Sequence, residues 1–95
     1  MTRDEDDATL FVQLSQGSTA ALATLYDRHA PVIYALALRL AGGERAPAED
    51  LTHDTFLALA RHARRRDLTP PRVLGWLVVH LLESAGRAST PTVDV

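Results

Sequence analysis

A chain of 95 residues that is 46% apolar and 23% charged can form one globular domain with a modest core, and this composition excludes a disordered chain. It contains no cysteine, which excludes disulfides and thiolate metal sites, and its longest nearly apolar run, residues 73–82, is too short to cross a bilayer. Because the acidic N-terminus has no apolar signal segment and the net charge of −2 favours no partner, we expect a cytoplasmic domain without membrane insertion.

Apolar residues at helical spacing predict an all-α fold, a compact bundle of about five helices, and no segment alternates as a strand would. Proline, glycine and capping residues separate the helical segments. We expect the helical domain over residues 1–87 and a flexible tail over residues 88–95. The expected helices are residues 4–17, 18–30, 31–41, 47–64 and 70–84.

Particular residues define the ends and the buried faces of these helices. As N-caps we expect Ser18 and Thr69, as helix-opening prolines Pro31 and Pro47, and as stop signals Gly17 and Gly42-Gly43. The apolar stripes expected to be buried in the first three helices are Leu10, Phe11 and Leu14; Ala21, Leu22 and Leu25; and Val32, Ile33, Leu36, Ala37 and Leu40.

The helix expected over residues 47–64 has two faces of different character. With about 100° of rotation per residue, the side expected to face the core gathers Ala48, Leu51, Thr52, Thr55, Phe56, Leu59 and Ala63. The opposite side gathers Glu49, Asp50, His53, Asp54, Leu57 and Arg61. Leu57 lies near the middle of this polar face, which is typical of a binding face, although single exposed leucines are also common. On spacing alone, both interpretations stay open.

The last expected helix is apolar almost all round. A helix with apolar residues on every side is normally buried, but in a small bundle one side can remain exposed. Such a side would be an apolar patch that pairs with another protein or with a second copy of the chain. We expect Trp76 and His80 in the core. We further expect Val73, Leu77 and Leu81 on the buried side, and Val78, Val79 and Leu82 in the patch.

Ordered blocks along the chain resemble the region-two domain of extracytoplasmic-function (ECF) bacterial sigma factors. The blocks are Leu-Tyr-Asp-Arg at 25–28, Ala-Glu-Asp at 48–50 followed by Phe56, and Trp-Leu at 76–77, and the resemblance covers about residues 7–81. It implies a compact helical bundle whose Ala-Glu-Asp helix docks on the coiled-coil clamp helices of the largest RNA polymerase subunit. It also implies that the following helix and loop melt the minus-ten promoter element and hold its unstacked bases.

Carried over to this chain, the resemblance assigns the outer side of the helix over residues 47–64 to the polymerase. Asp50 matches the clamp-facing aspartate, Asp54 stands where an acidic residue is usual, and His53 stands where glutamine is most frequent. Carboxylates form charge-assisted hydrogen bonds with the arginines of such a coiled coil, and Leu57 supplies an apolar centre. The expected polymerase-binding residues are Glu49, Asp50, His53, Asp54, Leu57 and Arg61.

The DNA-facing half of the chain departs from the family's pattern. Val79 and Leu82 occupy positions where basic side chains are common, and Glu83 stands at the usual asparagine. Neutralisation of phosphates provides much of DNA affinity, so these changes weaken the expectation of promoter binding. Residues 61–95 nevertheless carry six Arg against three Asp/Glu. The basic residues that could track a nucleic-acid backbone are Arg64, Arg65, Arg66, Arg72 and Arg87, and a solvated basic loop is the alternative.

Residues that often carry chemistry do not form a catalytic or metal motif in this sequence. Glu49, Asp50 and His53 have metal-ligand spacing but face outward, and His80 with Glu83 is a His/carboxylate pair in reversed order. Serine-nucleophile motifs, phosphate-binding glycine loops and dinucleotide fingerprints are absent from the sequence. We therefore expect neither an enzyme nor a site for a metal or another cofactor.

Two functions from different classes remain open. In the first, the chain is a sigma-factor-like domain for transcription initiation that binds core RNA polymerase and minus-ten promoter DNA. In the second, it is a stand-alone sigma-like interaction module that binds an anti-sigma regulator or a second copy of itself and no longer reads DNA. The chain ends at Val95, before the helix-turn-helix domain that follows in the family, so we expect either a fragment of a longer sigma factor or a natural stand-alone module.

Overall fold

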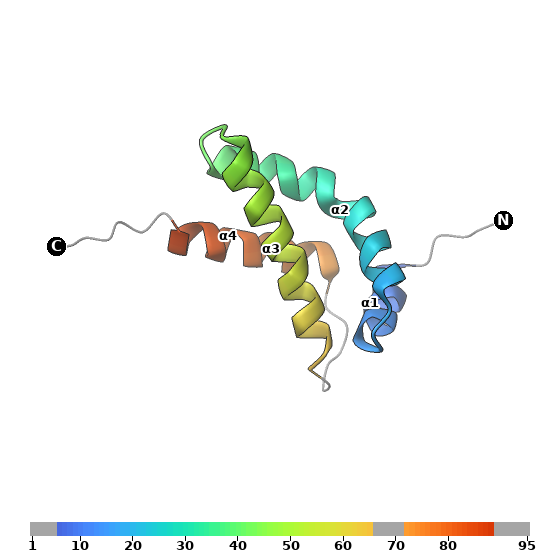
Figure 1. Ribbon diagram of the computed structural model, residues 1–95. Helices are drawn as coiled ribbons and strands as arrows, with labels where there is room; N and C mark the ends of the chain where they lie inside the picture. The colour runs from blue at the N-terminus through green and yellow to red at the C-terminus, as the bar shows by residue number, and fades with distance from the viewer. Residues whose placement is uncertain (1–5, 66–71, 89–95) are drawn as a thin grey trace.

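Four α-helices make up the described part of the chain, residues 6–65 and 72–88 of a computed structural model (Figure 1). No strand occurs in these two ranges, which confirms the all-α class. The predicted number of about five helices is wrong, because the segments predicted as two helices over residues 18–30 and 31–41 form one continuous helix. The four helices are α1 (Asp7–Ser15), α2 (Thr19–Leu40), α3 (Arg45–Ala63) and α4 (Val73–Ala88).

Pro31 lies inside α2 instead of opening a new helix. Proline has no backbone N–H to donate and its ring crowds the preceding turn, so a helix usually bends at it. Figure 1 shows that α2 changes direction near its middle. The helix continues because residues spaced by four stay buried on both sides of the proline. This buried row is Ala21, Leu25, His29, Ile33 and Ala37.

The buried row runs obliquely across α2, because residues spaced by four turn slowly around the helix axis. In the second half of α2, Ile33 and Ala37 are buried as predicted, and Leu36 is half-buried. Val32 and Leu40 are 48% and 44% exposed, so the prediction that both are buried is wrong. The prediction assumed a separate helix that starts at residue 31, with a buried stripe parallel to its axis. Such a stripe includes Val32 and Leu40, whereas the oblique row of the continuous helix does not.

Hydrogen-bonded caps define the turn between α1 and α2. Gly17 has a φ of +94° and donates to the Leu14 carbonyl at 2.9 Å, while the N–H of Ser18 donates to the Gln13 carbonyl at 3.0 Å. This arrangement is the glycine-terminated helix end predicted at Gly17. The side-chain oxygen of Ser18 then accepts the N–H of Ala21 at 3.0 Å, so Ser18 caps α2 as predicted.

The turn between α2 and α3 also ends on glycine. Gly42 and Gly43 have φ values of +68° and +88°, and the N–H of Gly43 donates to the Leu38 carbonyl at 2.8 Å. The predicted stop at this glycine pair is confirmed. α3 starts at Arg45, slightly before the predicted start at Pro47. Proline fits there because the N–H groups of the first turn have no helical partner anyway.

Charged side chains fasten the start of α1 to α2. Asp6 accepts a hydrogen bond from the backbone N–H of Thr9 at 2.9 Å, and this bond lowers the pKa of Asp6 below its ordinary value. Asp7 forms an ion pair with Arg28 at 2.8 Å, and its other oxygen lies 2.8 Å from Nε2 of His29. These contacts hold α1 against the middle of α2.

One row of residues packs α4 onto the rest of the bundle. Val73, Leu77 and Leu81 are buried as predicted, and Ala85 extends this row by one more turn. α4 therefore continues to Ala88, beyond the predicted end. Outside the described residues lie the predicted cap Thr69, the predicted helix start at residues 70–71 and the tail residues 89–95.

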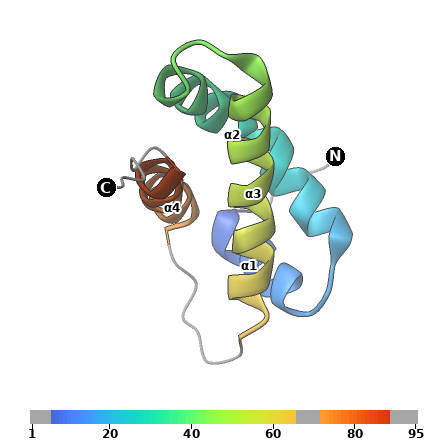
Figure 2. The same ribbon diagram turned by 60° about the vertical axis from the view of Figure 1, so that its left-hand side comes forward.

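The core lies where the four helices meet. α2 and α3 make the most extensive helix–helix contact, and α1 and α4 each pack against both of them. Figure 2 shows α4 at one margin of the molecule, so that one of its sides faces the other helices and the opposite side faces outward. Within the described ranges, each helix is too short or too polar to serve as a membrane span.

Candidate functional site

The outer side of α3 presents the six residues that the sequence places on its polar face. All six are exposed, and Leu57 is 45% exposed. Its neighbours Phe56 and Leu59 are buried on the core side, together with Ala58, which the sequence pattern left unassigned. Of the remaining residues on the predicted core side, Leu51 is half-buried and the others are buried. The buried ones are Ala48, Thr52, Thr55 and Ala63. The exposed residues are Glu49, Asp50, His53, Asp54, Leu57 and Arg61.

The two buried threonines of α3 satisfy their hydroxyl groups within the helix. The Thr52 hydroxyl donates to the Ala48 carbonyl at 2.8 Å, and the Thr55 hydroxyl donates to the Leu51 carbonyl at 2.7 Å. A buried hydroxyl that is hydrogen-bonded in this way needs no polar partner from another helix. The inner side of α3 can therefore pack on apolar residues alone, and its charged residues are left on the outer side.

A groove between α2 and α3 lies beside His53. It has a volume of 420 Å³, and the His53 ring meets the Tyr26 ring edge-on, with ring centroids 6.3 Å apart. This groove could not be predicted from the sequence, because a helical pattern describes one helix at a time and carries no signal for which residues of α2 lie next to α3. The lining residues are Thr19, Leu22, Ala23, Tyr26, Asp27 and His53.

A second groove lies on the other side of the α3 face, where Asp50 and Asp54 line a volume of 340 Å³. Leu40, Leu51 and Ala85 bring apolar surface to this groove from α2, α3 and α4. Two carboxylates beside apolar surface suit a long cationic side chain, whose aliphatic stem can be buried while its charged head stays polar. This groove could not be predicted from the sequence either, because its walls come from three different helices.

The three residues of α3 with metal-ligand spacing do not converge. Glu49 and His53 line a hollow beside Tyr26 and Tyr34 on the α2 side, whereas Asp50 lines the groove on the opposite side. In residues 6–65 and 72–88, no group of three or more His, Asp or Glu side chains is arranged to hold a metal ion.

A stack of four rings links three helices next to the C-terminal part of α3. His62 of α3 lies between Phe11 of α1 and Trp76 of α4, with ring centroids 5.9 Å and 5.0 Å away. Trp76 stacks in turn on His80, with centroids 5.1 Å apart and ring planes 6° from parallel. Trp76 and His80 were predicted to lie in the core, but both are only half-buried. The stack joins α4 to α3 along one side.

Acidification is expected to destabilise the fold through His80. Burial lowers the pKa of His80 below its ordinary value, and the positive charges of Arg87 and Arg61 lower it further, while Glu83 and Asp54 oppose them. The unfolded chain then binds this proton more readily than the folded chain does. The stabilising contribution of neutral His80 is therefore present above the ordinary histidine pKa and is lost as the pH falls through the folded value.

Thermal unfolding of the wild-type chain and of His80→Gln measures this effect. Between about pH 8 and about pH 5, which brackets the ordinary histidine pKa, we expect the Tm of the wild-type chain to fall more steeply than that of the variant. The other three histidines are present in both proteins, so the difference between the two slopes belongs to His80. Equal slopes would contradict the expectation.

The basic residues predicted to contact DNA lie at separate places. Arg64 and Arg65 are exposed after the end of α3, and Arg72 is exposed just before α4. The end of α3 and the start of α4 lie apart in both views (Figures 1 and 2). Arg87 is in the last turn of α4, about 20 Å along the helix from its start. Arg66 lies outside the described residues, and the others do not form one compact patch.

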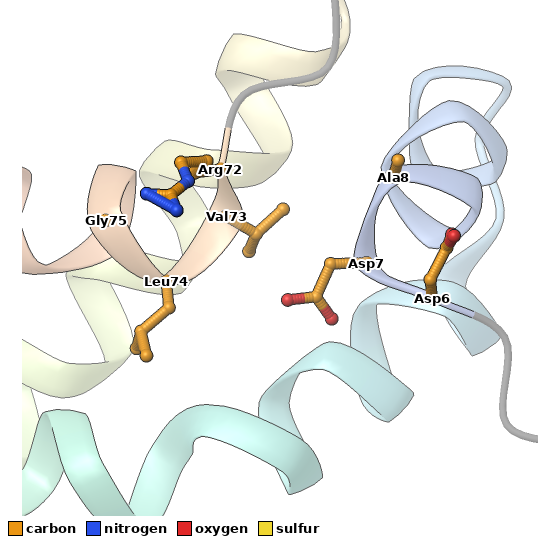
Figure 3. Close-up of a pocket in the computed structure, with 7 residues that line it drawn as sticks. All are labelled: Asp6, Asp7, Ala8, Arg72, Val73, Leu74 and Gly75. Atoms are coloured by element: carbon orange, nitrogen blue, oxygen red, sulfur yellow. The ribbon is translucent and has the colours of Figure 1, made fainter.

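Arg72 borders a hollow of 590 Å³ between the starts of α1 and α4. Figure 3 shows Arg72 and Leu74 on the α4 side and Asp7 on the α1 side. Both carboxylates of this hollow already have partners in the chain: Asp6 caps α1, and Asp7 binds α2. The hollow is therefore a structural junction between two helix starts.

The outer side of α4 has an apolar centre. Val79 and Leu82 are 55% and 50% exposed, and Glu83 is exposed beside them. Val78 is half-buried and packs against the core, so only part of the predicted patch lies fully on the surface. Exposed apolar residues with a neighbouring carboxylate do not suit contact with phosphates.

Comparison with known proteins identifies the family of this chain. The family model described as Sigma-70 region 2 matches residues 25–81, a range that includes most of α2, all of α3 and the first half of α4. Comparisons with curated proteins and with solved structures found no match. The matched range covers more than half of the chain and contains the whole exposed face of α3. The chain belongs to the sigma-70 region 2 family.

Proposed function

We propose that this chain is a region-two domain of the ECF type that binds core RNA polymerase through the outer side of α3. Sigma-70 region 2 domains are not enzymes; they act in transcription initiation, together with core RNA polymerase and promoter DNA. The proposed contact is with the coiled-coil clamp helices of the largest polymerase subunit, and the proposed location is the cytoplasm. The proposed contact residues are Glu49, Asp50, His53, Asp54, Leu57 and Arg61.

The observation that carries this proposal is the exposure of Leu57 at the centre of a charged surface. Protein interfaces commonly have an apolar centre that excludes water and a polar rim around it. Asp50 and Asp54 lie N-terminal to Leu57 on the same side of α3, and Arg61 lies one turn beyond it. Arginines of a coiled coil can form charge-assisted hydrogen bonds with the two carboxylates, while an apolar residue of the coil covers Leu57.

Binding of purified core polymerase to the immobilised chain tests the proposal. We expect the chain to retain core polymerase and also a fragment that contains only the clamp coiled coil. Binding to core polymerase without binding to the fragment would contradict the proposed contact. Failure of the wild-type chain to bind either would contradict the proposal as a whole.

Promoter DNA is the second proposed partner, bound as a single strand by the arginines that border α3 and α4. Arg64, Arg65 and Arg72 are exposed and can neutralise phosphates. Binding of unstacked bases requires exposed aromatic rings, whereas Trp76 is half-buried in the ring stack. We therefore expect DNA binding to be weak, with most of its free energy coming from the phosphates.

Replacement of Arg64 and Arg65 by alanine is expected to weaken binding of a single-stranded minus-ten oligonucleotide. Each lost phosphate contact should reduce the slope of log affinity against log salt by about 0.7. Fluorescence anisotropy at several salt concentrations measures the affinity and the slope. The matched control is the pair Arg39→Ala and Arg45→Ala. These exposed arginines lie in the last turn of α2 and at the first residue of α3, on either side of the turn that precedes α3. An equal loss of affinity in both double variants would contradict a site at Arg64 and Arg65.

A second candidate function is an interaction module that keeps the polymerase face and no longer reads DNA. The outer side of α4 favours it, because Val79 and Leu82 are more exposed than Leu57 and Glu83 adds a negative charge beside them. The proposed partners of this surface are an anti-sigma regulator and a second copy of the chain. Polymerase binding without any salt-dependent binding of single-stranded DNA would support this candidate over the first.

A further inference from the structure

The chain has four histidines, all within the described ranges, and only His53 is exposed. His29 is buried beside Asp7, and His62 and His80 are half-buried in the ring stack. His53 lies on the outer side of α3, inside the proposed polymerase contact. A change in its charge therefore acts directly on a partner bound there, whereas the other three act through the fold.

The His53 ring has a defined position at the edge of α3 next to α2. It lines the groove of 420 Å³ and also a neighbouring hollow of 400 Å³, and Tyr26 is the other residue that lines both. The Tyr26 ring packs on the Phe56 ring of the core, with centroids 4.8 Å apart, and meets the His53 ring edge-on at 6.3 Å. Because the core fixes Tyr26, this ring contact holds His53 where α2 and α3 meet.

Carboxylates from both helices lie around His53. Asp27 shares the groove with it from α2, Glu49 shares the hollow, and Asp50 and Asp54 are exposed near it on α3. None of the described residues of α1 or α4 lines either space. The titratable groups around the ring are Tyr26, Asp27, Tyr34, Glu49, Asp50 and Asp54. Between about pH 5 and about pH 8, carboxylates are ordinarily ionised, tyrosines are neutral and histidine changes its charge.

We propose that protonation of His53 weakens polymerase binding by the outer side of α3, which makes this contact sensitive to pH. The inference rests on the proposed function, because it requires a basic partner on that side. With neutral His53, the six residues of the outer side include three carboxylates and one arginine, and protonation adds a second cation. The added charge repels arginines of the coiled coil and competes with them for the carboxylates.

The direction of the effect follows from linkage. A basic partner binds the chain with neutral His53 more tightly than the chain with protonated His53, so binding must in turn favour release of the proton. The affinity is highest where histidine is neutral, and it declines as the pH falls through the range in which histidine takes up its proton. A partner that offered a carboxylate to His53 would produce the opposite dependence on pH.

His53→Gln separates the charge of this residue from its hydrogen bonds. Like neutral histidine, glutamine offers a donor and an acceptor, but it stays uncharged at every pH. One added like charge at an interface costs about tenfold in affinity. Between about pH 8 and about pH 5.5, we therefore expect the affinity of the wild-type chain to fall about tenfold more than that of His53→Gln.

Titration of core polymerase onto the wild-type chain and three variants at several pH values tests the inference. The matched control combines His53→Gln with Gln16→His, which keeps the composition of the chain and moves the histidine to an exposed position at the end of α1. It should show the same pH dependence as His53→Gln. His53→Arg carries its charge at every pH and should bind about tenfold more weakly than His53→Gln at about pH 8. Circular dichroism verifies that each protein is folded at each pH.

The number of protons released on binding gives a second readout. Calorimetric titration at about pH 6.5, the ordinary histidine pKa, in buffers of different ionisation enthalpy measures this number. We expect the wild-type chain to release more protons than His53→Gln does. A merely structural role of His53 would not produce this difference.

Equal pH dependence of the wild-type chain and His53→Gln would overturn the inference and leave the polymerase contact itself standing. It would also be overturned if the wild-type chain gained affinity on acidification relative to His53→Gln, because His53 would then meet a negative group. Recovery of the pH dependence by Gln16→His would overturn it as well, since the total charge of the chain would then be the cause. Absence of polymerase binding at every pH would contradict the proposed contact and the inference together.

Discussion

Leu59→Ala is expected to lower the free energy of unfolding by about 2–5 kcal/mol. Leu59 is completely buried on the inner side of α3 and belongs to the same core cluster as Leu25 and Leu77. Alanine removes apolar contacts there and leaves a cavity where α2, α3 and α4 meet. Since a small domain unfolds with a free energy on the order of 5–15 kcal/mol, this one change removes a large part of the stability.

Leu57→Ala is the matched control, with the same chemical change on the same helix. Leu57 is 45% exposed, so its replacement should cost less than about 1 kcal/mol. Urea unfolding followed by circular dichroism gives both free energies, and similar m values would show that the same surface is exposed on unfolding. Equal losses of stability in the two variants would mean that Leu57 is part of the core. The outer side of α3 would then have no exposed apolar residue at its centre to contact a partner.

Local sequence patterns were sufficient to predict most of the helical framework. Gly17, Ser18 and the Gly42-Gly43 pair end or start helices where expected, because each forms its cap from backbone and side-chain atoms only a few residues apart. The two faces of α3 were predictable for a similar reason, since one helix repeats every 3.6 residues and only one of its sides can face the core. Such features require no knowledge of the neighbouring helices.

Features that depend on several helices could not be predicted from these patterns. Pro31 normally indicates a helix boundary, but burial of Leu25, His29 and Ile33 along one row keeps α2 continuous through it. The exposure of Val32 follows from the oblique course of that row, which depends on where α1 and α3 pack. A local preference was overridden by packing in both cases.

The candidate site also combines features that one helix determines with features that depend on several helices. The exposed residues of α3 were predictable from one helix, whereas the two grooves beside them required the positions of α2 and α4. Tyr26 lies beside His53, and Leu40 and Ala85 lie beside Asp50, although each of these residues is distant in sequence from the residue it borders. The grooves extend the candidate surface beyond α3, so residues of all three helices can contribute to binding.

The proposed contact with the polymerase clamp depends on the acidic outer side of α3. Replacing Asp50 and Asp54 by arginine turns two attractive contacts into repulsion with a basic coiled coil. Like-charge contacts in an interface cost several kcal/mol, so we expect a loss of affinity of at least about 100-fold. Both residues are exposed, and the fold should therefore tolerate the change.

The most direct test is to titrate purified core polymerase onto the wild-type chain, onto this double variant and onto a control. The control carries Glu44→Arg and Glu83→Arg, which change the net charge by the same amount at exposed positions off the outer side of α3. We predict that polymerase binds the wild-type chain and the control with similar affinity and does not measurably bind the Asp50→Arg, Asp54→Arg variant. Equal binding of all three proteins would contradict polymerase binding through the outer side of α3.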